Sequence, residues 1–408
     1  MFYLQNNHQS LVSLLGKHCL GLTAHPSGRE DELLDWWREK FELSRCSDVR
    51  VQSDSYITCL ALEDIEQRYL LSGANNGNIF IHDLFNLAGT HHHAAEVVAK
   101  LDRETGQGGH RSAVADVSWY PLDTGLFLSS GSDGNLHVWD TNSMTKSESF
   151  RFKNKLICHA MSPVATAHSL IAVGGEESTV TLCDLRSGSN THQLRGHAAA
   201  TVDTCRWSPA HHYLLATGGR DKRILFWDVR YAKSQLASLV RSQSRPDGAH
   251  RAPVAGLRFL ADGRHLVSVG RDGACAVWDL LTGRPRQLTV PPLRLAAANS
   301  AGLGCQLAVT THGRRQLAFL PCGDQVVTCD LSSGEPVQRL DGHLRPVTAC
   351  QYDRREGRLI TSAADGQVLV WTAQRAAPPA EDGVREGGER TNGNNADHLM
   401  RDEWSDDD

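Results

Sequence analysis

The fold is decided by one stretch of the chain, residues 110–140, which reads HRSAVADVSWYPLDTGLFLSSGSDGNLHVWD. It holds four residues whose side chains can bond one another: His110, Ser129, Asp133 and Trp139. Three further sets have the same residue types at nearly the same spacing: His197, Thr217, Asp221 and Trp227; His250, Ser268, Asp272 and Trp278; His343, Thr361, Asp365 and Trp371. A loop histidine, a turn aspartate, a strand hydroxyl and an indole N–H can close one network, which spares buried polar groups a cost of roughly 1–3 kcal/mol each. We therefore interpret these residues as structural tetrads.

The tetrads repeat with the period of about 40 to 50 residues that is typical of β-propeller blades of the WD-repeat type. Weaker copies fill the gaps, so the tryptophan position occurs in seven frames: His82, Trp139, Cys183, Trp227, Trp278, Cys329 and Trp371. Each frame reads as short alternating strands separated by turns. The sequence predicts an all-β fold, a seven-bladed WD-repeat β-propeller. The expected blades span approximately residues 45–85, 105–143, 150–187, 196–231, 249–282, 293–333 and 342–374.

Blades one, three and six lack parts of the tetrad. In blade one Ser53 stands at the histidine position and Asn76 at the aspartate position, and Glu177 and Gly323 take the aspartate position of blades three and six. A blade packed between two neighbours tolerates this loss because both of its faces stay buried. We interpret the loss as drift, with divergence of a binding surface as the alternative.

Composition favours one large globular domain, because seven blades use about residues 45–375 of the 408. Hydrophobic residues make up 40% and charged residues 22% of the chain, which is ordinary for a soluble protein. No apolar run is long enough for a membrane span, and residues 1–20 lack a secretion signal. The 11 cysteines form no CxxC pair. This pattern indicates buried thiols in a reducing compartment, without disulfides or a zinc site.

Two segments lie outside the predicted blades. In residues 1–44, one helical face carries Leu11, Leu14 and Leu15, and a second run carries Leu33, Leu34, Trp36, Trp37 and Phe41. They predict a short helix-loop-helix, which either packs against the side of the ring or docks into a groove of another protein. Residues 376–408 hold ten acidic and three basic residues and predict a disordered acidic tail, in which Trp404 is either part of a docking motif or there by chance. Residues 43–51 are expected to add the outer strand to the last blade and so remove an open sheet edge.

The sequence shows no apparatus for catalysis and no need for a cofactor. It contains no phosphate-binding GxxxxGK[ST] loop, no GxSxG nucleophile elbow and no HExxH metal helix. His91, His92 and His93 are interpreted as a solvated loop, with metal binding as the alternative. Basic residues follow several tetrad histidines and enter blade three, and we predict that they converge on one rim: Arg111, Lys153, Lys155, Arg251 and Arg345. This candidate partner rim suits an acidic peptide better than nucleic acid, because no aromatic residues are interleaved with it. The alternative, and the commonest explanation of such residues, is plain solvated charge.

Several segments resemble one family of WD-repeat proteins beyond the repeat itself. They are SYITCLALEDIEQRYLLSG in blade one, WYPLDTGLFLSSGSDGNLHVWDTN in blade two, HAMSPVATAHSLIAVG with VTLCDLRSG in blade three, and WSPAHHYLLATGGRDKRILFWDVR in blade four. With the acidic tail around Asp402, Glu403 and Trp404, these segments resemble the Cockayne syndrome group A family. The resemblance runs from about residue 45 to the end, and it is weak in the His91 region and in residues 281–316.

The resemblance implies a non-catalytic substrate receptor of a cullin-RING ubiquitin ligase, acting in transcription-coupled nucleotide excision repair in the nucleus, on chromatin and the nuclear matrix. The implied partners are the damaged-DNA-binding adaptor subunit of the ligase, the Cockayne syndrome group B ATPase, RNA polymerase II and repair factors. Such receptors hold the adaptor through an N-terminal helix-loop-helix and a WDxR box, here Trp227-Asp228-Val229-Arg230, with a partial copy ending at Arg186. The implied adaptor contacts are Leu11, Leu14, Leu15, Leu33, Leu34, Trp36, Trp37, Arg186, Asp228 and Arg230. The alternatives are a WD-repeat scaffold of another nuclear complex and a direct binder of damaged DNA.

Overall fold

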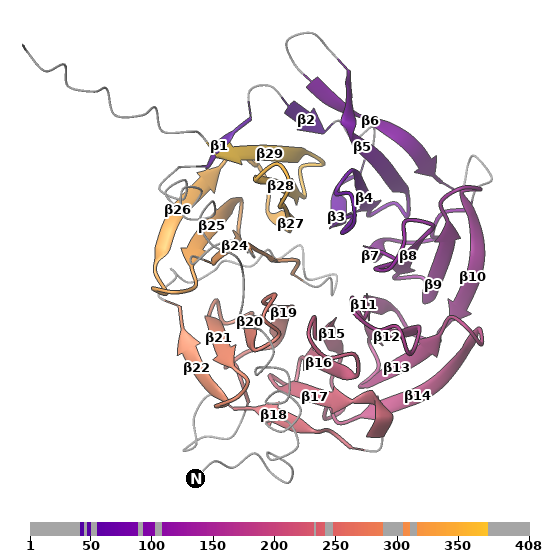
Figure 1. The fold of residues 1–408 in the computed structure, drawn as a ribbon, viewed down its shortest axis with the longest axis vertical. Helices are drawn as coiled ribbons and strands as arrows, with labels where there is room; N and C mark the ends of the chain where they lie inside the picture. The colour runs from indigo at the N-terminus through magenta and orange to yellow at the C-terminus, as the bar shows by residue number, and fades with distance from the viewer. Residues whose placement is uncertain are drawn as a thin grey trace, which may run out of the picture. The chain divides into compact units, whose positions relative to one another are not determined.

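Short antiparallel strands form seven blades arranged around a ring (Figure 1). The computed structural model describes residues 41–44, 47–49, 55–88, 93–102, 108–231, 234–240, 248–288, 305–310 and 316–373. Within these residues one turn of 3-10 helix, η2 (Val229–Tyr231), interrupts the strands. None of the helices in the described part is long and apolar enough to cross a membrane. The prediction of a seven-bladed propeller is confirmed. The predicted N-terminal helices and acidic tail lie outside the described residues.

The strand positions of each blade are called A to D, from the inner strand to the outer one. Blades one to three consist of β3 (Ile57–Leu62), β4 (Tyr69–Ala74), β5 (Ile79–Ala88) and β6 (His93–Leu101); β7 (Val114–Trp119), β8 (Leu126–Gly131), β9 (Asn135–Asp140) and β10 (Thr145–Arg151); and β11 (Leu156–Met161), β12 (Leu170–Gly175), β13 (Thr179–Asp184) and β14 (Ser189–Arg195).

Blades four to seven follow the same plan. They consist of β15 (Val202–Trp207), β16 (Leu214–Gly219), β17 (Ile224–Asp228) and β18 (Ala237–Leu239); β19 (Val254–Phe259), β20 (His265–Gly270), β21 (Cys275–Asp279) and β22 (Arg284–Gln287); β23 (Ala308–Val309), β24 (Leu317–Cys322), β25 (Gln325–Asp330) and β26 (Pro336–Asp341); and β27 (Val347–Asp353), β28 (Arg358–Ala363), β29 (Val368–Ala373) and β1 (Phe41–Leu43).

The antiparallel order gives the ring two different faces. Because successive strands of a blade run in opposite directions, the A-to-B and C-to-D turns lie at one end of the blade. The B-to-C turns and the connections from strand D to the next strand A lie at the other end. We call these the AB/CD face and the BC/DA face. A residue's loop type therefore tells on which face of the ring it lies.

Apolar side chains fill the spaces between neighbouring blades. Among the described residues there are seven buried apolar clusters, one at each of the seven blade-to-blade interfaces. All six residues of the B strand β16 are buried, because both faces of the blade are covered, whereas the outer strand β14 buries only Leu194. Each Å² of apolar surface removed from water contributes about 25 cal/mol to stability. These interfaces are therefore the main source of the ring's stability.

The ring closes by joining the two ends of the described chain. Strand β1 pairs antiparallel with β29 as the outer strand of blade seven, with Phe41 opposite Ala373. The amide group of Gln338 in blade six bonds both backbone groups of Phe41, at 2.9 and 2.8 Å. Strand β2 (Ser47–Val49) pairs in parallel with β6 of blade one and meets β29 only at Val49. The expectation for residues 43–51 is therefore corrected: the outer strand begins at Phe41. The expectation that Phe41 belongs to the second N-terminal helix is wrong as well, because Phe41 is extended in β1 and its ring is buried.

Replacing Phe41 with alanine should lower the free energy of unfolding by about 3 kcal/mol, because a buried phenylalanine is lost from a packed interface. The Phe41 ring is 3% exposed and lies 5.3 Å from the ring of Phe319, centroid to centroid. Denaturant unfolding of the full chain measures the change. The matched control is Leu43→Ala on the same strand, since Leu43 is 45% exposed and should matter little. Equal effects of the two variants would show that β1 does not close the ring.

Candidate functional site

Four hydrogen-bond networks hold the loops of the BC/DA face. In blade four the indole Nε1–H of Trp227 donates to Thr217 Oγ1 at 2.9 Å, and Thr217 Oγ1 lies 2.9 Å from His197 Nε2. His197 Nδ1 lies 2.9 Å from the carboxylate of Asp221. One proton order satisfies the whole chain: indole to hydroxyl, hydroxyl to Nε2, and Nδ1–H to carboxylate. The other predicted tetrads meet in the same way in blades two, five and seven.

The tetrad of blade five is looser than the others. His250 Nδ1 lies 3.5 Å from Asp272, compared with 2.9 to 3.2 Å for the closest histidine–aspartate contacts in the other three blades. The bond from Trp278 Nε1 to Ser268 is nevertheless 2.8 Å long. The indole and hydroxyl therefore keep their places in every complete tetrad, while the histidine–aspartate contact varies.

The pKa values of three tetrad carboxylates, those of Asp133, Asp221 and Asp272, are lowered. Burial alone would raise the pKa of Asp133, but the hydrogen bond with His110 and the backbone N–H of Arg111 outweigh it and hold the pKa far below its usual range. The same opposing causes, with burial again the largest single one, bring the pKa of Asp272 to about 2. A fixed negative charge is thus built into each of these turns.

These aspartates fix the basic residues of the candidate partner rim. The backbone N–H of Arg111 donates to Asp133 at 2.9 Å, and that of Arg251 donates to Asp272 at 2.8 Å. The backbone is held while the side chains of both arginines are exposed. In blade seven the bond to Asp365 comes from Leu344, so Arg345 follows one position later. All three arginines lie in D-to-A connections and so share the BC/DA face, as predicted.

Two more residues of the predicted rim lie on the same face, and one apolar residue was missed. Lys153 and Lys155 are exposed in the connection from β10 to β11, and Lys155 lies 3.8 Å from the exposed Glu176. Leu344, between His343 and Arg345, is 83% exposed. Its position directly after a tetrad histidine is the signal that would have found it. The BC/DA face thus combines spaced positive charges with at least one exposed apolar side chain.

Blade one keeps part of a tetrad in altered form. His82 occupies the tryptophan position and lies 2.9 Å, through Nε2, from Ser72 Oγ. Burial lowers the pKa of His82 to about 4, so the ring is neutral near pH 7. Sequence comparison of the frames placed His82 correctly but did not predict this bond. The hydroxyl and ring contact therefore persists in a blade that has lost the histidine and aspartate of the motif.

The candidate adaptor edge lies on the other face, the AB/CD face. Asp228 ends β17, and Arg230 lies in η2, between the C and D strands of blade four. Arg230 donates from Nη2 and Nε to Asp228 at 2.6 and 3.0 Å, and this hydrogen bonding raises the pKa of Arg230. The guanidinium carbon of Arg230 lies 4.8 Å from the ring centroid of Tyr213 and 5.7 Å from that of Tyr231. Asp228 and Arg230 therefore form an ion pair, and the rings of two tyrosines lie beside its guanidinium group.

The position of Arg230 differs from that of comparable arginines in other blades. In blades one and five the aspartate that follows the tryptophan position of strand C is bound by an arginine that precedes strand B: Arg68 with Asp83, and Arg264 with Asp279. In blade four the position before strand B holds Tyr213 instead, and the arginine comes from the C-to-D loop. Tyr231, beside Arg230, is 72% exposed. The guanidinium group of Arg230 and the exposed ring of Tyr231 therefore lie side by side at this edge, where both can contact a partner.

Arg186 lies in the corresponding loop of the neighbouring blade three. Its backbone N–H donates to Asp184 at 3.1 Å, and its side chain is exposed. Arg186 and Arg230 are thus brought to adjacent C-to-D loops on one face. The remaining predicted adaptor contacts, Leu11, Leu14, Leu15, Leu33, Leu34, Trp36 and Trp37, lie outside the described residues.

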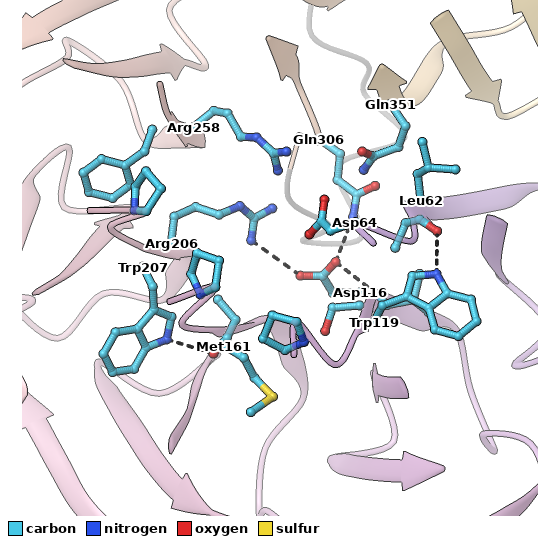
Figure 2. A pocket seen from close by; sticks show the side chains of 18 of the residues that line it. Leu62, Asp64, Asp116, Trp119, Met161, Arg206, Trp207, Arg258, Gln306 and Gln351 are labelled. Atoms are coloured by element: carbon cyan, nitrogen blue, oxygen red, sulfur yellow. Dashed lines mark hydrogen bonds and ion pairs between the residues drawn. The ribbon is translucent and has the colours of Figure 1, made fainter. Parts of the chain in front are cut away.

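The centre of the AB/CD face is hollowed by a cavity of about 400 Å³. Figure 2 shows Arg206 and Arg258 reaching into it from one side, with Asp64 and Asp116 on the other. Sequence reasoning missed both arginines. They lie one position before the ends of β15 and β19, where blades one, two and three have Ala61, Ser118 and Ala160. Comparison of this inner-strand position across the frames would have found them.

One cluster of the described residues has the spacing of metal ligands, and it is part of a tetrad. His110, Asp133 and His137 bring their ligand atoms within 4.8 Å of one another. Both ring nitrogens of His110 are already hydrogen-bonded, and His137 Nδ1 lies 2.8 Å from Ser149 Oγ. The cluster is therefore committed to hydrogen bonds. His91 and His92 lie outside the described residues, and so does the side chain of His93.

Comparison of the sequence with known proteins identifies the same repeats as the tetrads. The WD domain, G-beta repeat, model matches residues 103–140, 188–228, 242–279 and 334–372, which hold the four complete tetrads. The chain is similar to WD repeat-containing protein ATCSA-1 of Arabidopsis thaliana, at 29% identity across 81% of this chain and 88% of that protein. Radiation-sensitive protein 28 of Saccharomyces cerevisiae is 23% identical across 59% of this chain and 51% of its own length. Transducin beta-like protein 3 of Bos taurus is 29% identical across 58% of this chain and 29% of its own length. With seven blades and four tetrads, the chain is a WD-repeat protein.

Proposed function

We propose that this chain is the substrate receptor of a cullin-RING ubiquitin ligase in transcription-coupled nucleotide excision repair. The observation that carries the proposal is the similarity to ATCSA-1, which extends over 88% of that protein rather than over the repeats alone. The similarity to a protein named radiation-sensitive points in the same direction. The proposed partners are the ligase's damaged-DNA-binding adaptor, the Cockayne syndrome group B ATPase and stalled RNA polymerase II, with repair factors, in the nucleus.

The two faces suit the two halves of this role. The AB/CD face offers Arg230, fixed by Asp228 and flanked by the exposed Tyr231, as an edge for the adaptor. The BC/DA face offers Arg111, Arg251 and Arg345 on loops that the tetrads hold still. A rigid ring that binds the adaptor on one face and the substrate on the other holds the substrate close to the ligase. This proximity raises the effective concentration of the substrate, as ubiquitin transfer requires. No group of this chain takes part in the chemistry.

Deleting residues 1–40 should abolish co-purification of the adaptor and leave the ring folded, because the deletion stops just before β1, the strand that closes it. Arg230→Glu in the full chain should weaken adaptor binding at least about tenfold, since it reverses a charge at the proposed contact. Affinity purification followed by quantitative binding measures both effects, and thermal melting checks the fold.

The matched control is Arg68→Glu, because Arg68 makes a similar ion pair with Asp83, 2.7 Å long, on the same face of blade one. Normal adaptor recovery by the truncated chain would overturn the docking assignment. Equal losses for the Arg68 and Arg230 variants would mean that adaptor binding is not specific to the edge of blade four. A folded chain that never binds the adaptor would support the alternative, a scaffold of another nuclear complex.

Direct binding of damaged DNA is the second candidate, favoured by the basic residues on the BC/DA face. It requires an affinity that falls steeply with salt and that declines further when Arg111, Arg251 and Arg345 are replaced. Fluorescence anisotropy with damaged and undamaged duplexes at several salt concentrations separates the two functions. Negligible affinity at low salt eliminates this candidate.

A further inference from the structure

The central cavity of the AB/CD face contains two arginines whose guanidinium groups keep unused hydrogen-bond donors. Arg206 and Arg258 occupy equivalent inner positions in consecutive blades, four and five. Arg206 Nη1 donates to the carbonyl oxygen of Cys205 at 2.9 Å and lies 3.9 Å from Asp116, while its Nε is buried without a hydrogen-bond partner among the described residues. Arg258 is only partly exposed, and no hydrogen bond links its side chain to the rest of the described chain. Both side chains are therefore available to a ligand.

The electrostatic surroundings do not neutralise these two cations. Burial, followed by the nearby charge of Arg206, lowers the pKa of Arg258 to about 10, and Arg354 at the cavity wall acts in the same direction. Asp64 opposes this shift, but its side chain is exposed. The guanidinium remains charged at neutral pH. Two neighbouring cations that repel each other in a partly desolvated cavity are stabilised by an added anion.

The carboxylate nearest to the two arginines is already occupied. Asp116 Oδ1 accepts hydrogen bonds from Gln306 Nε2 at 2.7 Å and from the backbone N–H of Val117 at 3.0 Å. Asp116 Oδ2 accepts a weaker one from the backbone N–H of His159 at 3.3 Å. Asp116 thus ties together blades two and three and the segment before β23. Its negative charge faces the cavity, but its lone pairs are largely used.

Besides the polar residues Ser118, His159, Gln306, Gln351 and Arg354, the wall has an apolar and aromatic part. The indoles of Trp119 and Trp207 donate to backbone carbonyls of the preceding blades, Ala61 and Ala160, so that their rings stay in the wall. Met161, Phe259 and three prolines complete this lining. A ligand that fits must therefore bring an anionic group for the arginines and apolar atoms for the wall. A polyphosphate has no apolar atoms, and its charges would be repelled by Asp64 and Asp116.

We propose that this cavity binds an acidic peptide segment of a partner protein, with a glutamate or aspartate carboxylate between Arg206 and Arg258 and a neighbouring apolar side chain against Trp207 and Met161. A carboxylate that accepts from two guanidinium groups forms charge-assisted hydrogen bonds, which are the strong class in proteins. The inference goes beyond the ligase role and does not depend on it, because the isolated chain suffices to test it.

The test uses the purified full chain and two peptide libraries, acetylated at one end and amidated at the other: X-X-Glu-X-X, with X any residue except cysteine, and the same library with glutamine at the centre. Affinity selection with quantification by mass spectrometry reads the ratio of retained peptides. We expect the glutamate library to be enriched about tenfold or more. Arg258→Met and Arg206→Met should each remove most of this enrichment. Arg195→Met, an exposed residue of the outer strand β14 away from the cavity, is the matched control and should keep it.

Inositol hexakisphosphate serves as the phosphate probe, titrated by calorimetry. The proposal expects weak binding that does not change in Arg258→Met. Equal retention of the two libraries, or enrichment that survives both arginine variants, overturns it. Phosphate binding that depends on Arg258, without selection for glutamate, also overturns it and assigns the cavity to a phosphate ligand instead. Thermal melting of each variant checks folding, and the two arginine variants provide independent tests if one of them folds poorly.

Discussion

Replacing Trp227 with alanine should lower the free energy of unfolding by about 4 kcal/mol, the range measured for large aromatic residues deleted from packed cores. Trp227 is completely buried at the interface of blades three and four. Its six-membered ring lies so close to the Gly196 backbone that a Cβ there would come within 2.7 Å. The substitution also removes the indole donor from Thr217 Oγ1, so a tetrad is damaged along with the packing. Equilibrium unfolding in urea measures the loss.

Two variants separate packing from hydrogen bonding at this position. Trp227→Phe keeps most of the apolar volume but lacks the N–H donor, and it should lose about 1–2 kcal/mol. Tyr231→Ala, four residues further along, alters an aromatic side chain that is 72% exposed and should leave stability nearly unchanged. If Trp227→Ala were no more destabilising than Tyr231→Ala, the tetrads would not be the basis of the ring's rigidity.

The stability of the ring should fall steeply below about pH 6.5, because several buried histidines are neutral in the folded protein. Burial lowers the pKa of His82 and His159 to about 4 and that of His137 to about 3. The unfolded chain binds protons at these sites below about pH 6.5, and the folded chain does not until about pH 4. Between these values unfolding takes up protons, so each histidine lowers stability by about 1.4 kcal/mol per pH unit.

Urea unfolding at several pH values between 4.5 and 7.5 measures this slope. His159→Gln removes one titrating site, whose ring nitrogens bond Ser118 and Ser130 at 2.8 and 2.9 Å, and should reduce the slope by about one proton. His192→Gln alters an exposed residue of β14 and should leave the slope unchanged. Asp133, Asp221 and Asp272 have lowered pKa values, so their contribution is lost only at lower pH, below about 4. A flat profile between pH 5 and 7 would contradict the prediction.

The sequence predicts those parts of the fold in which the same set of hydrogen-bonding residues recurs from blade to blade. Four tetrads were found from spacing alone, since a buried indole, hydroxyl, imidazole and carboxylate must occur together to satisfy one another. The five residues of the candidate partner rim were placed by the same frame. The closing strand was misjudged because Phe41 to Leu43 is a short segment with weak alternation, and its strand partner, Ala373, lies at the far end of the propeller.

The cavity could not be predicted because no repeat specifies it. Comparison of the frames singles out Arg206 and Arg258 as charges at a position that holds alanine or serine in blades one to three, but the motif does not indicate that they line a cavity. Their proximity follows only from ring closure, which brings inner strands of different blades to one axis. The tyrosines beside Arg230 were missed for a similar reason: Tyr213 and Arg230 are separated along the chain by a whole hairpin and meet only at the end of the blade.

The pairing of β1 with β29 also sets the order of events during synthesis. Strand β1 leaves the ribosome among the first parts of the ring, but its partner ends at Ala373, almost the last. At about 5–20 residues per second, the early strand waits on the order of tens of seconds before it can pair. Until then β1 lacks its partner strand, and its backbone N–H and C=O groups have no ladder to join. Closure through such distant residues gives a high contact order and slow final folding, which makes the nascent chain a natural client of chaperones.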